Sequence, residues 1–192
     1  MFIKDWKREL FTIPNLLSFF RLVLVPVYVY IYLHAVTDDQ YLIAGSIMAL
    51  SCITDLIDGK IARHFNMISN VGKVLDPLAD KVTQLALILC LSVRYRILYP
   101  VLFLFLTKEL FQLFVCIYHL HKRKALAGAL PAGKLCTTVL FVSLIALVLL
   151  PHLPSTLVDA LVLTDALFLT ISFISYFLAY YGKDKKLQDL QE

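Results

Sequence analysis

Long apolar segments alternate with short polar ones along the chain, and this spacing predicts helices that cross a membrane. A helix needs about 20 apolar residues to span the hydrocarbon. Six segments qualify, at about 12–33, 41–63, 73–93, 100–118, 134–150 and 156–181. The first eleven residues, MFIKDWKRELF, instead place apolar and basic side chains on opposite helix faces, which is typical of a helix lying in the membrane interface.

These segments predict an all-α integral membrane protein. It consists of an interfacial helix at 1–11, six transmembrane helices within 12–181 and a charged tail at 182–192, in a single domain that spans 1–192. The composition agrees, because 60% of the 192 residues are apolar, against about 45 to 50% in soluble domains. Nucleic acid is not expected as a partner.

The basic residues predict the orientation of the chain. If the N-terminus is cytoplasmic, 14 of the 18 Lys and Arg residues fall on the cytoplasmic side, as the positive-inside rule requires. They are Lys4, Lys7, Arg8, Lys60, Arg63, Lys73, Lys81, Lys122, Arg123, Lys124, Lys134, Lys183, Lys185 and Lys186. We therefore expect a multi-pass protein of the cytoplasmic (inner) membrane, with both termini and the segment 55–80 facing the cytoplasm.

Four aspartates stand out against this apolar background: Asp55, Asp58, Asp76 and Asp80. Each ionised Asp near the bilayer centre costs roughly 2.5 to 3.5 kcal/mol, so the four require compensation. The first two are three residues apart and the last two are four apart, so each pair shares one helix face. Because helices joined by a short loop lie side by side, the carboxylates can converge. A metal site made only of oxygen ligands, with no His or Cys at matching spacing, favours Mg²⁺ or Mn²⁺ over zinc.

Two other interpretations of the aspartates remain. In the first, they form interfacial salt bridges with nearby Lys and Arg residues, but such pairs contribute little and need no clustered spacing. In the second, they line the cation path of a transporter or channel. That path predicts acids spread over the membrane depth, and it gives no reason for Gly59, Ala62 and Arg63.

The full pattern is Asp55-x2-Asp58-Gly59-x2-Ala62-Arg63-x8-Gly72-x3-Asp76-x3-Asp80. At every fixed position it resembles the signature of the CDP-alcohol phosphatidyltransferase family. The resemblance implies a membrane enzyme, expected to be a homodimer, that transfers a phosphatidyl group from CDP-diacylglycerol to an alcohol and releases CMP.

The same resemblance implies roles for the signature residues. Asp55, Asp58 and Asp76 would hold two metal ions, and Asp80 would complete the metal site and act as the catalytic general base. The donor's CDP group would be bound by Asp55, Asp58, Gly59, Ala62, Arg63, Gly72 and Asp76.

Residues outside the signature bear on the acceptor alcohol. The segment from Pro14 to Arg21, PNLLSFFR, and the element Gly133-Lys134-x2-Thr137 resemble those of bacterial phosphatidylglycerophosphate synthases, which use glycerol 3-phosphate. An acceptor-phosphate site with Arg21, Lys134 and Thr137 follows from this resemblance. Lys108 is added to this site because charged residues within a membrane usually mark a substrate path. The chain departs from these synthases at Leu140, where they often have Gln, and at Lys108, where they often have Arg.

Alternatives for the acceptor residues stay open. Arg21 could snorkel to the lipid headgroups, Lys108 could pair with Glu109, and Lys134 could be an interfacial anchor. Other acceptors would suit the same signature. They are phosphatidylglycerol, which would give cardiolipin, and inositol phosphate or serine. Asp165 in the last segment is interpreted as a polar residue between packed helices.

Overall fold

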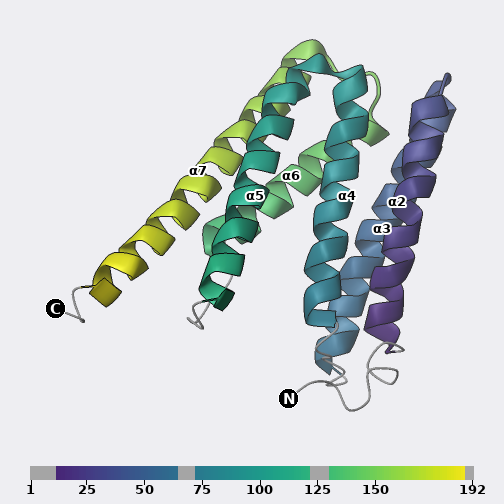
Figure 1. Cartoon of the computed structure of the whole chain (residues 1–192). Coiled ribbons are helices and arrows are strands. Elements are labelled where there is room, and N and C mark those ends of the chain that lie inside the picture. Colours follow the sequence, from purple (N-terminus) through teal and green to yellow (C-terminus); the bar gives the residue numbers. More distant parts are fainter. Residues whose placement is uncertain (1–11, 65–71, 122–129, 189–192) are drawn as a thin grey trace. The chain divides into compact units, whose positions relative to one another are not determined.

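A computed structural model of the chain describes residues 12–64, 72–121 and 130–188, and all regular structure in these ranges is helical. The elements are α2 (Ile13–His34), α3 (Asp38–His64), α4 (Gly72–Arg94), the 3-10 helix η1 (Arg96–Leu98), α5 (Tyr99–His121), α6 (Pro131–Leu149) and α7 (Ser155–Gln188) (Figure 1). Each predicted apolar segment corresponds to one long helix. The predicted interfacial helix at 1–11 lies outside the described residues.

The number of membrane spans differs from the prediction. Among the described residues, four helices are long and apolar enough to cross a membrane: α2, α5, α6 and α7. The predicted six spans are therefore corrected to four candidates. For α4 the physical reason is charge, because it carries Asp76, Asp80 and Lys81 together. The side chains of α3 are described only as far as residue 54.

The distribution of side chains supports a membrane location for these helices. Large apolar side chains are exposed along their outer faces, for example Phe103, Phe114 and Leu163. Polar side chains are buried instead, among them Arg21 and Lys108. In water this arrangement would be costly, whereas in lipid the exposed apolar faces contact acyl chains and the polar groups find partners inside the protein.

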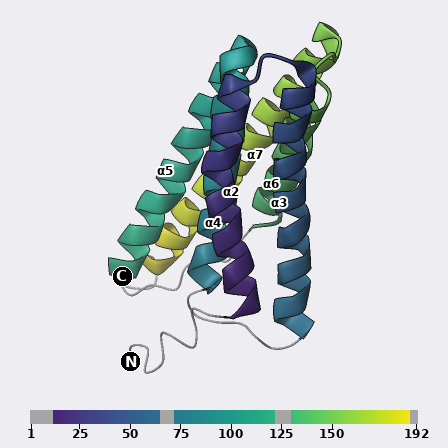
Figure 2. The same cartoon turned by 90° about the vertical axis from the view of Figure 1, so that its right-hand side faces the viewer.

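The chain forms two compact units, and the first contains residues 12–91 and 144–152 of the described part. Its helices α2, α3 and α4 run side by side (Figures 1 and 2). The turn between α2 and α3 is closed by Gln40, whose side-chain oxygen accepts hydrogen bonds from the backbone N–H groups of Val36 and Thr37 at 2.6 and 3.2 Å. A Cβ at Gly45 would lie 2.8 Å from Leu149, so α3 approaches the end of α6 closely there.

The second unit contains residues 92–121, 130–143 and 153–188 of the described part, and α5 packs along α7 within it. The Phe111 ring contacts the rings of Phe173 and Tyr180, with centroids 5.2 and 6.4 Å apart. A buried polar contact joins α6 to α7, where the Ser143 hydroxyl lies 2.5 and 2.6 Å from the two carboxylate oxygens of Asp165. This agrees with the predicted packing role of Asp165.

Candidate active site

A stripe of polar side chains runs along one face of α2, which is otherwise apolar. Asn15, Ser18 and Arg21 are three residues apart, and none is more than 2% exposed. The phenylalanines at 19 and 20 are exposed on other faces. Because residues three apart in a helix point the same way, α2 turns its polar stripe into the first unit.

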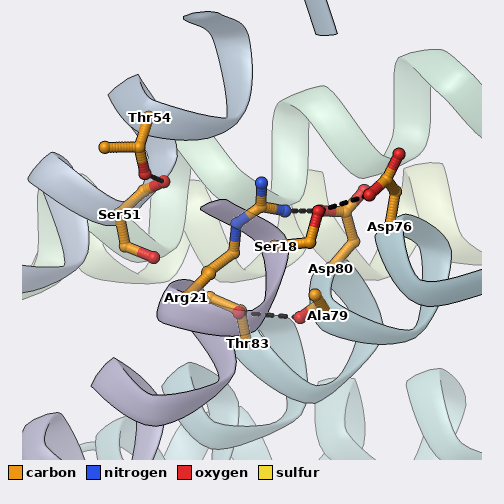
Figure 3. A network of polar contacts seen from close by, with 8 residues as sticks. All are labelled: Ser18, Arg21, Ser51, Thr54, Asp76, Ala79, Asp80 and Thr83. Carbon is orange, nitrogen blue, oxygen red and sulfur yellow. Dashed lines mark hydrogen bonds and ion pairs between the residues drawn. The ribbon is translucent and has the colours of Figure 1, made fainter. Parts of the chain in front are cut away.

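The polar stripe of α2 contacts two of the four signature aspartates, both on α4. The Ser18 hydroxyl donates a hydrogen bond to Oδ1 of Asp76. One turn further, Arg21 Nη1 donates to Oδ1 of Asp80 at 2.5 Å, forming an ion pair (Figure 3). The Arg21 side chain is 2% exposed and that of Asp80 39% exposed. An inward-facing arginine therefore compensates a carboxylate that stays accessible.

The two contacts form at matching depths. The start of α2, the end of α3 and the start of α4 lie at the same end of the first unit (Figures 1 and 2). At 1.5 Å per helical residue, Ser18 and Asp76 lie about 7 and 6 Å from these helix ends. Arg21 and Asp80 both lie about 12 Å from them. The pairs therefore join side chains at the same level of two parallel-running helices.

The backbone of α3 brings the other two aspartates to the same levels. Asp58 lies about 9 Å and Asp55 about 14 Å from the end of α3 at the same rise per residue. Their side chains, like those of Gly59, Ala62 and Arg63, fall in the stretch 55–64, of which only the helical backbone is described. The convergence of the four carboxylates accordingly stays a prediction. Gly72 is described and is buried at the start of α4.

The described side chains include no group of three or more acidic, His or Cys residues that could hold a metal ion. Two of the four predicted ligands, Asp76 and Asp80, are within that description, four residues apart on α4. Their oxygen chemistry suits a hard divalent cation. A complete metal site would need the aspartates of α3.

The remaining acceptor-site candidates belong to the second unit. Lys108 on α5 is 3% exposed, and its ammonium lies 2.7 Å from the Glu109 carboxylate. Lys134, near the start of α6, is exposed, and the Thr137 hydroxyl donates to the Lys134 backbone carbonyl at 2.8 Å. The Lys108–Glu109 contact is the pair considered from the sequence. A role for these residues in phosphate binding stays a prediction.

The sequence interpretation gave Ser18 no role of its own. A signal was present, because three polar residues at helical spacing in an apolar span indicate an inward-facing stripe. Neighbouring hydroxyls are satisfied locally: Thr54 donates to the Ser51 carbonyl at 2.7 Å and Thr83 to the Ala79 carbonyl at 2.8 Å (Figure 3).

Comparison with known proteins identifies the family. A sequence model of the CDP-alcohol phosphatidyltransferase family matches residues 11–175, which include both α2 contacts and the whole aspartate signature. The chain belongs to this family. We interpret the geometry of α2, α3 and α4 as that of a member of this family.

Individual relatives carry two kinds of names. The CDP-diacylglycerol–glycerol-3-phosphate 3-phosphatidyltransferase of Aquifex aeolicus is 36% identical over 133 residues, covering 69% of this chain and 71% of that protein. The cardiolipin synthase of Rattus norvegicus is 47% identical over 91 residues, or 47% of this chain and 28% of that protein. A Schizosaccharomyces pombe fusion of cardiolipin synthase and a hydrolase is 43% identical over 88 residues, 46% of this chain but only 14% of that protein.

Proposed function

We propose that this protein transfers a phosphatidyl group from CDP-diacylglycerol to glycerol 3-phosphate, giving phosphatidylglycerol phosphate and CMP. The observation that carries the proposal is the complete aspartate signature on α3 and α4, with Asp76 and Asp80 contacted by Ser18 and Arg21 of α2. Glycerol 3-phosphate is preferred as acceptor because the Aquifex aeolicus relative, whose name specifies it, matches over 69% of this chain and 71% of its own length.

The residues fit a divalent-cation site. Asp55, Asp58, Asp76 and Asp80 would hold two Mg²⁺ or Mn²⁺ ions, which would neutralise the donor diphosphate and stabilise the departing CMP. Gly59, Ala62, Arg63 and Gly72 would lie around the cytidine diphosphate. The small residues among them would let the donor approach the helix backbones closely.

Asp80 is assigned as the general base. It would take the proton from the acceptor hydroxyl, whose oxygen then attacks the phosphorus that carries diacylglycerol, while the bond from this phosphorus to the CMP oxygen breaks. The exposed fraction of its side chain, 39%, leaves room for an incoming alcohol.

Arg21 is assigned to position the acceptor beside this base. A guanidinium has five N–H donors, so one nitrogen can bind Asp80 while others bind a phosphate. The acceptor's phosphate would then be held next to the carboxylate that deprotonates its hydroxyl. Lys108, Lys134 and Thr137 of the second unit stay the further candidates for phosphate binding.

The second candidate acceptor is phosphatidylglycerol, which would give cardiolipin. It is favoured by the higher identity of the cardiolipin synthases, 43% and 47% over 88 and 91 residues. Those matches cover less than half of this chain and at most 28% of these relatives. We therefore rank this acceptor second.

The proposed setting is the cytoplasmic membrane, with the aspartates on the cytoplasmic side and the chain assembled as a homodimer. The exposed apolar faces of α2, α5, α6 and α7 support membrane insertion. The excess of Lys and Arg residues in the segments predicted to be cytoplasmic supports the orientation.

An acceptor screen tests the function. Purified protein is supplied with CDP-diacylglycerol, Mg²⁺ and either glycerol 3-phosphate, phosphatidylglycerol, inositol phosphate or serine, and CMP and the lipid product are measured. Product with glycerol 3-phosphate supports the proposal, and product only with phosphatidylglycerol selects the second candidate. Absence of CMP with every acceptor would refute both.

A further inference from the structure

Two buried polar side chains lie just beyond the aspartates and take no part in the site described above. Ser51 on α3 and Gln84 on α4 are 0% and 1% exposed. The Ser51 hydroxyl and both amide atoms of Gln84 have no hydrogen-bond partner among the residues that the structure describes. Buried polar groups are nearly always paired, so these three atoms indicate a partner of another kind.

Their positions in the helices are matched. Ser51 precedes Asp55 by one turn on α3, and Gln84 follows Asp80 by one turn on α4. At 1.5 Å per residue, they lie about 20 and 18 Å from the joined ends of these two helices, about 6 Å beyond the respective aspartates. Both belong to the first unit, whose helix α2 is apolar enough to span a membrane. The pair therefore lies on the membrane-interior side of Asp55 and Asp80.

The chemistry of the pair selects the class of partner. Gln84 and Ser51 are uncharged, and their donors, Nε2 and Oγ, suit a neutral acceptor oxygen. A phosphate is a poor candidate because it is charged, and neither Gln84 nor Ser51 carries a charge that could compensate it at this depth in the membrane. A diacylglycerol has its ester carbonyls on the acyl-chain side of its phosphate, which is the direction from the aspartates to this pair.

We propose that Gln84 and Ser51 bind the ester carbonyls of the lipid donor's diacylglycerol and so make the enzyme selective for ester-linked over ether-linked donors. The inference rests on the proposed function, in which the donor diphosphate lies at the aspartates. Gln84 Nε2 has two hydrogens, and Ser51 Oγ supplies a third donor. Gln84 Oε1 is left for a bridging water, as is common in polar sites.

The test compares CDP-diacylglycerol with its ether analogue, CDP-dialkylglycerol, in mixed micelles, with the acceptor that supports CMP release. The wild-type kcat/KM is expected to be about three- to tenfold higher for the ester donor, as one neutral hydrogen bond contributes. Gln84→Met keeps the length of the side chain and should lower this ratio the most, through the KM for the ester donor. Ser51→Ala should lower the ratio by a smaller factor.

Matched controls separate this effect from general damage. Gln112→Met makes the same change on α5, and Ser46→Ala removes an exposed α3 hydroxyl that bonds to the Leu42 carbonyl at 2.8 Å. Both controls should retain the wild-type ratio. Because Gln84→Met removes unpaired buried atoms, the variant is expected to fold, and its melting temperature in detergent checks this.

The outcomes of the two proposals are distinguishable. An ester-to-ether ratio unchanged by Gln84→Met, or a change in the KM of the acceptor alone, would overturn the ester-binding role while leaving the transferase intact. No CMP release from wild-type protein with any acceptor would instead refute the proposed function.

Discussion

Removal of the Arg21 guanidinium is expected to weaken the fold by breaking its ion pair with Asp80. Arg21→Met keeps most of the side-chain length and fills the buried space with apolar atoms, but it deletes the donor that lies 2.5 Å from Asp80 Oδ1. Asp80→Ala removes the acceptor of the same contact. The double variant removes both partners, so it leaves neither charge facing the position of the other.

The magnitude follows from the burial of the two partners. Breaking a fully buried ion pair costs about 3 to 5 kcal/mol, because the remaining charge is unpaired and dry. After Arg21→Met the remaining charge is Asp80, which is 39% exposed and is partly hydrated. We therefore expect a loss of about 1.5 to 3 kcal/mol, as for a hydrogen bond to a charged group. Asp80→Ala should cost more, because the guanidinium that remains is only 2% exposed.

The coupling between Arg21 and Asp80 is measured by equilibrium unfolding of the four proteins in detergent. Denaturant is titrated and unfolding is followed by intrinsic fluorescence. The double variant should be more stable than the sum of the single losses predicts, by at least about 1.5 kcal/mol. Single losses that add to within about 0.5 kcal/mol would refute the ion pair, because additivity of that quality is the mark of independent sites.

Three further predictions concern the second unit and the metal requirement. Gly133→Ala should lower the unfolding free energy by about 1 to 3 kcal/mol, because the added Cβ would lie 2.6 Å from the Tyr176 hydroxyl. This hydroxyl accepts a hydrogen bond from the Leu130 N–H. A Gly133→Ala variant as stable as wild type would contradict this prediction. Asp165→Ala should cost about 0.5 to 1.5 kcal/mol through the lost Ser143 contact, with CMP release per folded molecule unchanged; a loss of turnover at unchanged stability would give Asp165 a catalytic role. Chelation of divalent cations should stop CMP release and added Mg²⁺ or Mn²⁺ should restore it, whereas activity that persists in excess chelator would exclude the proposed metal site.

The helices could be predicted from the sequence because apolar length and period are local properties. All six long helices lie where apolar segments predicted them, and α4, for example, begins and ends within one residue of the predicted 73–93. The number of membrane spans was predicted less well, because α4 combines apolar length with Asp76, Asp80 and Lys81 near its start. Hydropathy alone does not say how such charges are compensated.

The site could be predicted as a set of residues but not as a set of contacts. Asp76 and Asp80 were identified from spacing, and Arg21 was predicted to bind the acceptor phosphate. That the partner is Asp80, and that Ser18 contacts Asp76, depends on the register of α2 against α4, which is a tertiary property. Serine also has no strong signature in an apolar helix, since its small hydroxyl can bond to the backbone of its own helix.

The central claim is that the aspartate signature carries a CMP-releasing transfer with Asp80 as its base. The most direct measurement is the rate of CMP release from CDP-diacylglycerol by Asp80→Asn, compared with wild type at saturating Mg²⁺ and acceptor. Asn keeps an oxygen that can accept the Arg21 hydrogen bond, so the variant should fold, and its melting temperature in detergent checks this. We predict a rate lower by about 10² to 10⁴, the usual contribution of a general base; a variant that releases CMP at the wild-type rate would contradict the account.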